Sequence, residues 1–68
     1  MSPLRCIVVD DEPLAVKMLE NNISRTAFLE LEASFTDPVA ALEAIRDRQP
    51  QLAFLDIQMP DQIGRAHV

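Results

Sequence analysis

Three short stretches of the chain have the apolar pattern of strands. Residues 4–9 are almost continuously apolar and rich in β-branched side chains, which favours a strand covered on both faces. Residues 52–56 form a similar run that ends in an acid. Residues 29–35 alternate strictly between apolar and polar side chains, which predicts a strand with one covered face at the edge of a sheet. The apolar members of that alternation are Leu29, Leu31, Ala33 and Phe35.

Two amphipathic helices are predicted between these strands. Asp11 or Glu12 can cap the first helix and Pro13 suits its first turn, while Asp37 and Pro38 begin the second helix in the same way. The predicted core-facing stripe of the first helix is Ala15, Met18, Leu19 and Ile23, with Asn22 at its rim. The predicted apolar side of the second helix is Val39, Ala41, Leu42 and Ile45.

The order β-α-β-α-β predicts an α/β fold with a parallel sheet, because each connection is long enough for a helical crossover. If the alternating strand lies at the edge, the first strand is central and the spatial order is 2-1-3. That order begins the doubly wound, flavodoxin-like sheets. Right-handed crossovers then place the two helices on opposite faces.

Composition narrows the possible functions. With 68 residues the chain forms at most one domain. Its 6 basic and 11 acidic side chains give a net charge of −5, which disfavours direct binding to nucleic acid. No stretch has the pattern of a membrane span or signal peptide, so we expect a cytoplasmic protein. The single cysteine, Cys6, lies in an apolar run and is expected to be a buried core residue.

Three carboxylates follow the two apolar strands. Asp10 and Asp11 come at the end of the first strand, and Asp56 ends the third. Adjacent parallel strands lie roughly 4.8 Å apart, so these acids are expected in one crevice at the switch point of the sheet. A hard divalent cation would relieve their repulsion, and an all-oxygen site suits Mg²⁺ with a phosphoryl group. Glu12 is interpreted as a favourable charge near the helix N-terminus.

An alternative interpretation needs no ligand. Asp10 and Asp11 would cap the first helix, and Asp56 would be an ordinary polar strand end. Either acidic segment alone fits this interpretation. Acids at the ends of two adjacent strands fit it less well.

At these residues the chain resembles the receiver domain of bacterial two-component response regulators. The segments "VVDDEP" (residues 8–13) and "LAFLDIQMP" (residues 52–60) stand where that family has its acidic pair and its phosphorylated aspartate. The combination of "RCIVVDDEPLA" with "FLDIQMP" is most similar to receivers of the LytTR class, which precede a DNA-binding domain.

The resemblance implies specific roles. Asp56 would be the phosphoacceptor, taking a phosphoryl group from a phosphohistidine of a sensor histidine kinase. Asp11 would bind Mg²⁺ directly, Asp10 directly or through water, and Gln58 through its main-chain carbonyl; Asp56 completes the set. The protein would be a phosphorylated switch, rather than an enzyme, that controls an output domain in the same parent chain.

The resemblance also predicts where the native sequence ends. Residues 1–61 correspond to the N-terminal half of a receiver, without its later strands and helices. Residues 62–68 are interpreted as a non-native tail, because "IGRAHV" is the translation of ATC GGA AGA GCA CAC GTC, part of a common sequencing adapter. The alternative is a genuine tail, since Gly64 falls where receivers often have a glycine. His67 is therefore given no metal role.

Two rival functions remain open. A phosphotransferase of the haloacid dehalogenase type would use Asp10 as its nucleophile, although that class requires Asp-x-Asp and the chain has Asp10-Asp11-Glu12. A non-signalling interaction module would use the acids only as caps and would need no Mg²⁺.

Overall fold

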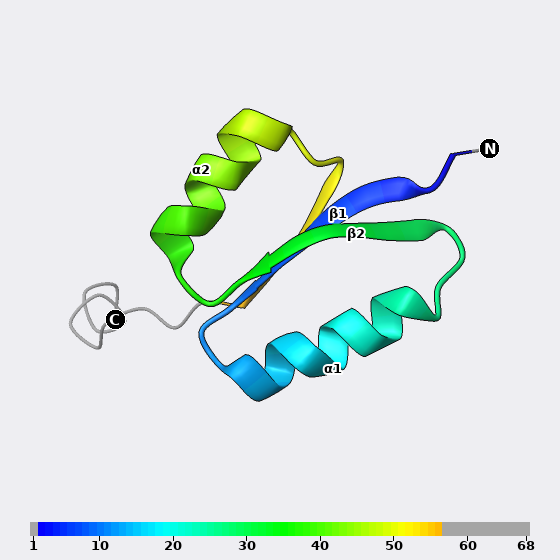
Figure 1. The fold of residues 1–68 in the computed structure, drawn as a ribbon, viewed down its shortest axis with the longest axis horizontal. Helices are drawn as coiled ribbons and strands as arrows, with labels where there is room; N and C mark the ends of the chain where they lie inside the picture. Colours follow the sequence, from blue (N-terminus) through cyan, green and yellow to red (C-terminus); the bar gives the residue numbers. More distant parts are fainter. Residues whose placement is uncertain (1, 57–68) are drawn as a thin grey trace, which may run out of the picture.

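A three-stranded parallel sheet forms the centre of the molecule, in the order β2-β1-β3. The computed structural model describes residues 2–56. Its elements are β1 (Leu4–Asp10), α1 (Pro13–Ser24), β2 (Leu29–Phe35), α2 (Pro38–Arg48) and β3 (Leu52–Asp56). Helices α1 and α2 lie on opposite sides of the sheet (Figure 1). The predicted element order, strand order and flavodoxin-like winding are therefore confirmed.

Strand β1 is the most buried element because it has a strand on each edge and a helix over each face. Its residues from Cys6 to Val9 are at most 1% exposed. Their side chains alternate between two apolar clusters, as expected for a strand covered on both sides. On the α1 side the buried cluster is Cys6, Val8, Val16 and Ile23; on the α2 side it is Ile7, Val9 and Ala41. Cys6 is thus the buried core residue that the sequence predicted.

Strand β2 contains an irregularity that the alternating sequence did not predict. Cys6 is paired with Leu31, but the next residue of β1, Ile7, is paired with Ala33. Glu32 is the extra residue of a β-bulge, which is uncommon between parallel strands. Leu29 and Leu31 therefore pack on the α1 side, whereas Ala33 and Phe35 pack on the α2 side. The prediction that all four share one face is wrong, although β2 does lie at the edge.

The helices contact the sheet along narrower stripes than predicted. In α1 the contacts come from Val16, Leu19 and Ile23, while Met18 is 67% exposed and Asn22 is also exposed. Met18 lies two positions beyond Val16, which is about 200° around a helix, so both cannot face the sheet. No helix within residues 2–56 is long and apolar enough to cross a bilayer.

Helix α2 also contacts the sheet along a narrower row of side chains than predicted. Ala41 is buried and Ile45 packs beside it, but Val39 and Leu42 are mostly exposed. Val39 precedes Ala41 by two positions and so faces away from the sheet for the same geometric reason. Asp37 caps this helix as predicted, because its Oδ1 accepts a hydrogen bond from the amide of Val39 at 3.2 Å. Pro38 and Pro13 each stand in the first turn of their helices.

One polar contact joins α1 to the edge strand. The Ser34 hydroxyl donates a hydrogen bond to Oε2 of Glu20, and both side chains are partly buried. The bulge makes this contact possible, since it turns Ser34 toward α1. Glu20 is thus a partly buried charge held against the edge strand rather than a solvated surface residue.

Candidate functional site

Asp10 and Asp56 are direct partners across β1 and β3. The pairing runs without interruption from Cys6 with Leu52 to Asp10 with Asp56. Because the strands are parallel, both aspartates stand at the same end of the sheet, where the carboxyl ends of the strands meet. Neighbouring strands are roughly 4.8 Å apart. The predicted meeting of the two acid-tipped strands is therefore confirmed.

Asp10 also organises the start of α1. Its side chain is buried, with only 4% of the residue exposed, and its Oδ1 accepts a hydrogen bond from the amide of Glu12 at 2.9 Å. Glu12 is the N-cap residue by position, yet its own side chain makes no capping hydrogen bond. The predicted capping by the Glu12 side chain is therefore not found; instead, Asp10 binds the amide of this N-cap residue in the turn that leads from β1 into α1.

Asp11 and Asp56 are exposed, in contrast to Asp10. Within residues 2–56 no three side chains of His, Cys, Asp or Glu lie close enough together to hold a metal ion. The expected convergence of Asp10, Asp11 and Asp56 on one point is therefore not found, whereas the pairing of Asp10 with Asp56 is. The Oδ1 atom of Asp10 is already held by the Glu12 amide. The pair of Asp10 and Asp56 is therefore an all-oxygen ligand set with one member fixed in place.

This ligand set fits Mg²⁺ as far as the described residues go. Mg²⁺ is usually held by one or two carboxylates and completes its octahedral shell with waters and phosphate oxygens. Two carboxylates on adjacent strands, with exposed Asp56 and Asp11 open to solvent, satisfy that requirement. Gln58, the predicted main-chain ligand, lies outside the described residues.

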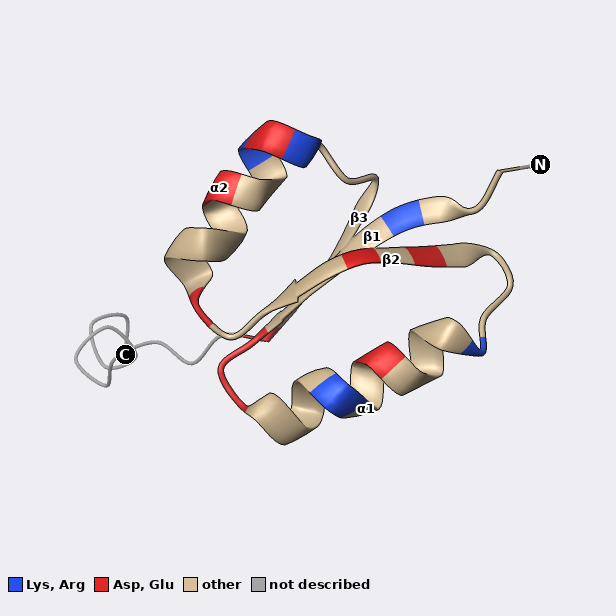
Figure 2. Ribbon diagram, in the orientation of Figure 1, with Lys and Arg blue, Asp and Glu red and all other residues tan. Residues whose placement is uncertain are grey.

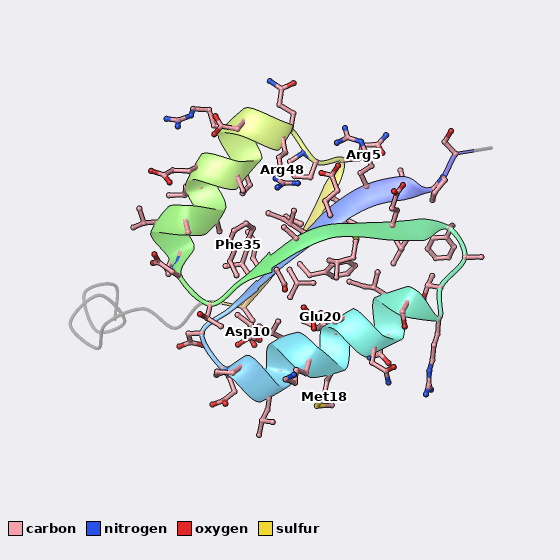
Figure 3. All side chains as sticks on the ribbon, viewed as in Figure 1. Arg5, Asp10, Met18, Glu20, Phe35 and Arg48 are labelled. Carbon is pink, nitrogen blue, oxygen red and sulfur yellow. The ribbon has the colours of Figure 1, made fainter. Side chains whose placement is uncertain are left out.

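Charge is distributed unevenly over the molecule. Acidic residues gather where the strands end and the helices begin, at the left of the view in Figure 2. These acids are Asp10, Asp11, Glu12, Asp37 and Asp56. Arg5 and Arg48 lie at the other end of the sheet, as the labels in Figure 3 show. The acidic end therefore repels free anions and attracts cations, which would have to accompany any phosphoryl group bound there.

Comparison with known proteins decides the family. Residues 6–67 match the model of the response regulator receiver domain. The chain belongs to this family. The match covers both acid-tipped strands of the receiver and continues past residue 61, where the native sequence was predicted to end. Residues 57–68 lie outside the described residues, so the proposed non-native tail remains a prediction.

Individual relatives agree with this assignment. An uncharacterized response regulatory protein of Shewanella oneidensis is 40% identical over 57 residues, which is 84% of this receiver and 24% of that protein. One of Vibrio vulnificus is 34% identical over 61 residues, covering 90% of this chain and 25% of the relative. A protein-glutamate methylesterase/protein-glutamine glutaminase of Xanthomonas oryzae is 36% identical over 63 residues, which is 93% of this chain and 18% of that protein. The chain thus spans a quarter or less of the length of these relatives.

Proposed function

We propose that this receiver is a phosphorylation switch in which Asp56 accepts a phosphoryl group from a sensor histidine kinase, with Mg²⁺ bound beside it. The observation that supports the proposal is the pairing of Asp56 with Asp10 across the ends of β1 and β3. Of the two, Asp56 is exposed and free to meet a partner protein, whereas Asp10 is buried and fixed by the Glu12 amide. This difference supports Asp56 as the nucleophile and Asp10 as the group that helps to hold the cation.

The proposed reaction is a phosphoryl transfer between two proteins. A carboxylate oxygen of Asp56 attacks phosphorus in line with the bond to the kinase imidazole. The P–N bond breaks as the O–P bond of an acyl phosphate forms, and the imidazole nitrogen is left to take up a proton. Bound Mg²⁺ would neutralise charge that the nucleophile and the phosphoryl oxygens share.

The chain's own residues would hold that arrangement together. Asp10 is oriented by the Glu12 amide at 2.9 Å and fixes one side of the cation site. Asp56 would supply the second carboxylate. Asp11, exposed at the position after Asp10, would have to turn toward this pair to add a third, and Gln58 would add its main-chain carbonyl. Because Asp10 also binds the amide of Glu12, the N-cap residue of α1, a change in the ligands of Asp10 would be transmitted to the start of that helix.

The output controlled by the switch is part of the proposal. We propose a domain in the same parent protein, with DNA binding of the LytTR type as the expected output. The Xanthomonas relative, whose name is that of a methylesterase and glutaminase, supports an enzymatic output as the second candidate. In either case the receiver is a cytoplasmic regulatory module that is phosphorylated, rather than an enzyme with a substrate of its own.

Phosphoryl uptake tests the proposal directly. The protein encoded by the complete reading frame is incubated with Mg²⁺ and a small phosphodonor, and its intact mass is measured. We expect a gain of one phosphoryl group that is stable in acid and labile in base, and that is lost in Asp56→Asn. Asp47→Asn is the matched control, because Asp47 is an exposed acid on α2 near the opposite end of the molecule.

The other outcomes identify the rival functions. Loss of the mass gain in Asp10→Asn with full retention in Asp56→Asn would indicate that Asp10 is the nucleophile, as in haloacid dehalogenase-type phosphotransferases. No gain with any donor, with and without Mg²⁺, would leave a non-signalling module in which Asp10 serves only as a cap.

A further inference from the structure

Arg5 connects four segments of the chain at the end of the sheet opposite the aspartates. Its Nη1 donates to Oε2 of Glu32 in the β2 bulge at 3.1 Å. The same nitrogen donates to the carbonyl of Arg48 at 3.3 Å, and Nη2 donates to the carbonyl of Gln49 at 3.1 Å. One guanidinium group on β1 therefore holds both the bulge and the carboxyl end of α2.

The backbone of Arg5 is bound as firmly as its side chain. The amide of Arg5 donates to Oε1 of Gln51 at 2.9 Å, and the amide of Gln51 donates to the carbonyl of Arg5 at 2.9 Å. Gln51 immediately precedes β3. Arg5 and Gln51 are 46 positions apart, which is also the separation of every pair from Cys6 with Leu52 to Asp10 with Asp56. This reciprocal contact thus lies immediately before the first pair of the β1–β3 ladder, Cys6 with Leu52.

The turn between α2 and β3 depends on the same arginine. Gln49 has a left-handed backbone conformation, with φ of 50° and ψ of 60°, which is unfavourable for a residue with a Cβ atom. The Nη2 of Arg5 donates a hydrogen bond to the carbonyl of this residue. The contact therefore lies in the turn between the end of α2 and the start of β3.

We infer that Arg5 and Gln51 form a register clamp that positions Asp56 opposite Asp10. Apolar pattern alone defines this register poorly, because Leu52, Ala53, Phe54 and Leu55 are all apolar and face a β1 segment that is also apolar. A shift by one or two residues would still place apolar side chains against each other. A two-residue shift would displace Asp56 by roughly 6.6 Å along the strand and separate the carboxylates.

The register clamp acts at a distance from the site, so its members are positioning residues. Its importance for signalling rests on the proposed function, but its effect on strand register does not. Two kinds of measurement are therefore needed, one of strand pairing and one of Mg²⁺ binding.

The test compares three variants of the protein encoded by the complete reading frame. Arg5→Lys keeps the positive charge but cannot span two carbonyls and a carboxylate with a rigid fork. Gln51→Ala removes the side-chain half of the reciprocal pair, and Arg5→Ala removes the guanidinium entirely. Arg46→Ala is the charge control, since the ion pair of Arg46 with Asp47 is exposed and remote from the ladder. Ile23→Val is the stability control, because it trims the core on the α1 side.

Strand pairing is measured by nuclear Overhauser contacts between backbone protons. In the unchanged protein we expect contacts of Val9 with Leu55 and of Val9 with Phe35, one on each side of β1. In the clamp variants we expect the contact with Leu55 to weaken or move to a neighbouring residue, while the contact with Phe35 persists. We also expect Mg²⁺ alone to bind on the order of tenfold more weakly, as for other changes in groups that orient metal ligands. Both controls should retain both contacts and the Mg²⁺ affinity.

Opposite results would refute the register clamp. One such result is that all three variants keep the Val9–Leu55 contact and the Mg²⁺ affinity of the unchanged protein. The other is that the Val9–Leu55 and Val9–Phe35 contacts are lost together. If Arg5→Ala does not fold, Arg5→Lys and Gln51→Ala decide the question by the same criteria. A protein that shows the expected pairing but neither binds Mg²⁺ nor takes up phosphoryl would refute the proposed function and leave the positioning role intact.

Discussion

Asp10 and Asp56 occupy the last rung of the β1–β3 ladder, so two like charges are held on adjacent strands. Such cross-strand pairs of like charge are destabilising by about 0.2–1 kcal/mol. In metal-free buffer we therefore expect Asp56→Asn to raise the free energy of unfolding by an amount in this range. Urea unfolding, monitored by circular dichroism in the presence of a chelator, measures the change.

Addition of Mg²⁺ should reverse that order of stability. A ligand that binds only the folded state at ten times its dissociation constant stabilises the fold by about 1.4 kcal/mol. The unchanged receiver should gain this amount, whereas Asp56→Asn should gain much less. Asp47→Asn should respond to Mg²⁺ like the unchanged protein. Equal Mg²⁺ responses in all three proteins would show that Asp56 takes no part in binding the cation.

The bulge at Glu32 leads to a prediction about deletions in β2. Removing Glu32 joins Leu31 directly to Ala33 and leaves every other residue of the strand on its present face. The protein should then lose only the ion pair with Arg5, which costs about 0.2–1 kcal/mol for a partly exposed pair. Removing Ser34 instead turns Phe35 away from α2 and forfeits its burial, at a cost of about 1.5–3 kcal/mol.

Thermal unfolding of the two deletion variants compares these costs. The Glu32 deletion should melt close to the unchanged protein, and the Ser34 deletion well below it. Equal melting temperatures would mean that the two halves of β2 are not committed to different faces of the sheet.

Much of this fold follows from residues that are close together in sequence. The apolar run from Cys6 to Val9 predicts a strand with two covered faces, and prolines after short polar segments mark both helix starts. The adjacency of Asp10 and Asp56 also follows, because parallel strands of order 2-1-3 must end side by side. These features depend on pattern and connectivity, which a single sequence contains.

Other features depend on contacts between distant segments. The alternation in residues 29–35 is a clear signal for one covered face, and nothing local to it reveals that Glu32 is an extra residue. The Glu32 side chain binds the guanidinium of Arg5, 27 positions away. Likewise, Met18 and Leu42 belong to apolar stripes in the sequence, but a three-stranded sheet contacts only one narrow row of each helix. The fork of Arg5, which the sequence did not indicate, is visible only once α2, β2 and β3 are placed around it.

The narrow contact row of α1 predicts different sensitivities for two neighbouring apolar residues. Val16 is 7% exposed and packs against the core, so Val16→Ala removes buried methyl groups and should cost about 1–3 kcal/mol. Met18 is 67% exposed, so Met18→Ala should change stability by no more than about 0.5 kcal/mol. Chemical denaturation of both variants is the measurement. A larger loss of stability in Met18→Ala would indicate that Met18 packs against the core, as the sequence predicted.

The left-handed conformation of Gln49 predicts a stabilising change. Glycine has no Cβ atom and adopts this conformation without the cost of about 1 kcal/mol that a residue with a side chain incurs. Because Arg5 binds the main-chain carbonyl of Gln49, that hydrogen bond is retained in Gln49→Gly. We expect stability to rise by about 0.5–1 kcal/mol, seen as a higher denaturation midpoint. Gln49→Val should lower it, since a β-branched residue is least compatible with positive φ. A lower midpoint for Gln49→Gly would contradict this account of the turn.

Cys6 makes the stability of the fold depend on alkaline pH. Burial, and secondarily the nearby Glu32 carboxylate, raises the pKa of the Cys6 thiol. The folded state therefore keeps its proton at pH values where the unfolded chain, with an ordinary thiol pKa of about 8.5, has lost it. Stability from this group is fully present below about pH 8.5 and declines as the pH rises toward the raised pKa of the folded state.

Denaturation midpoints measured from pH 7 to pH 10 should fall in the unchanged protein. They should fall less steeply in Cys6→Ala, which cannot titrate there although it is less stable throughout. Parallel pH profiles for the two proteins would show that the thiol titrates alike in the folded and unfolded chains.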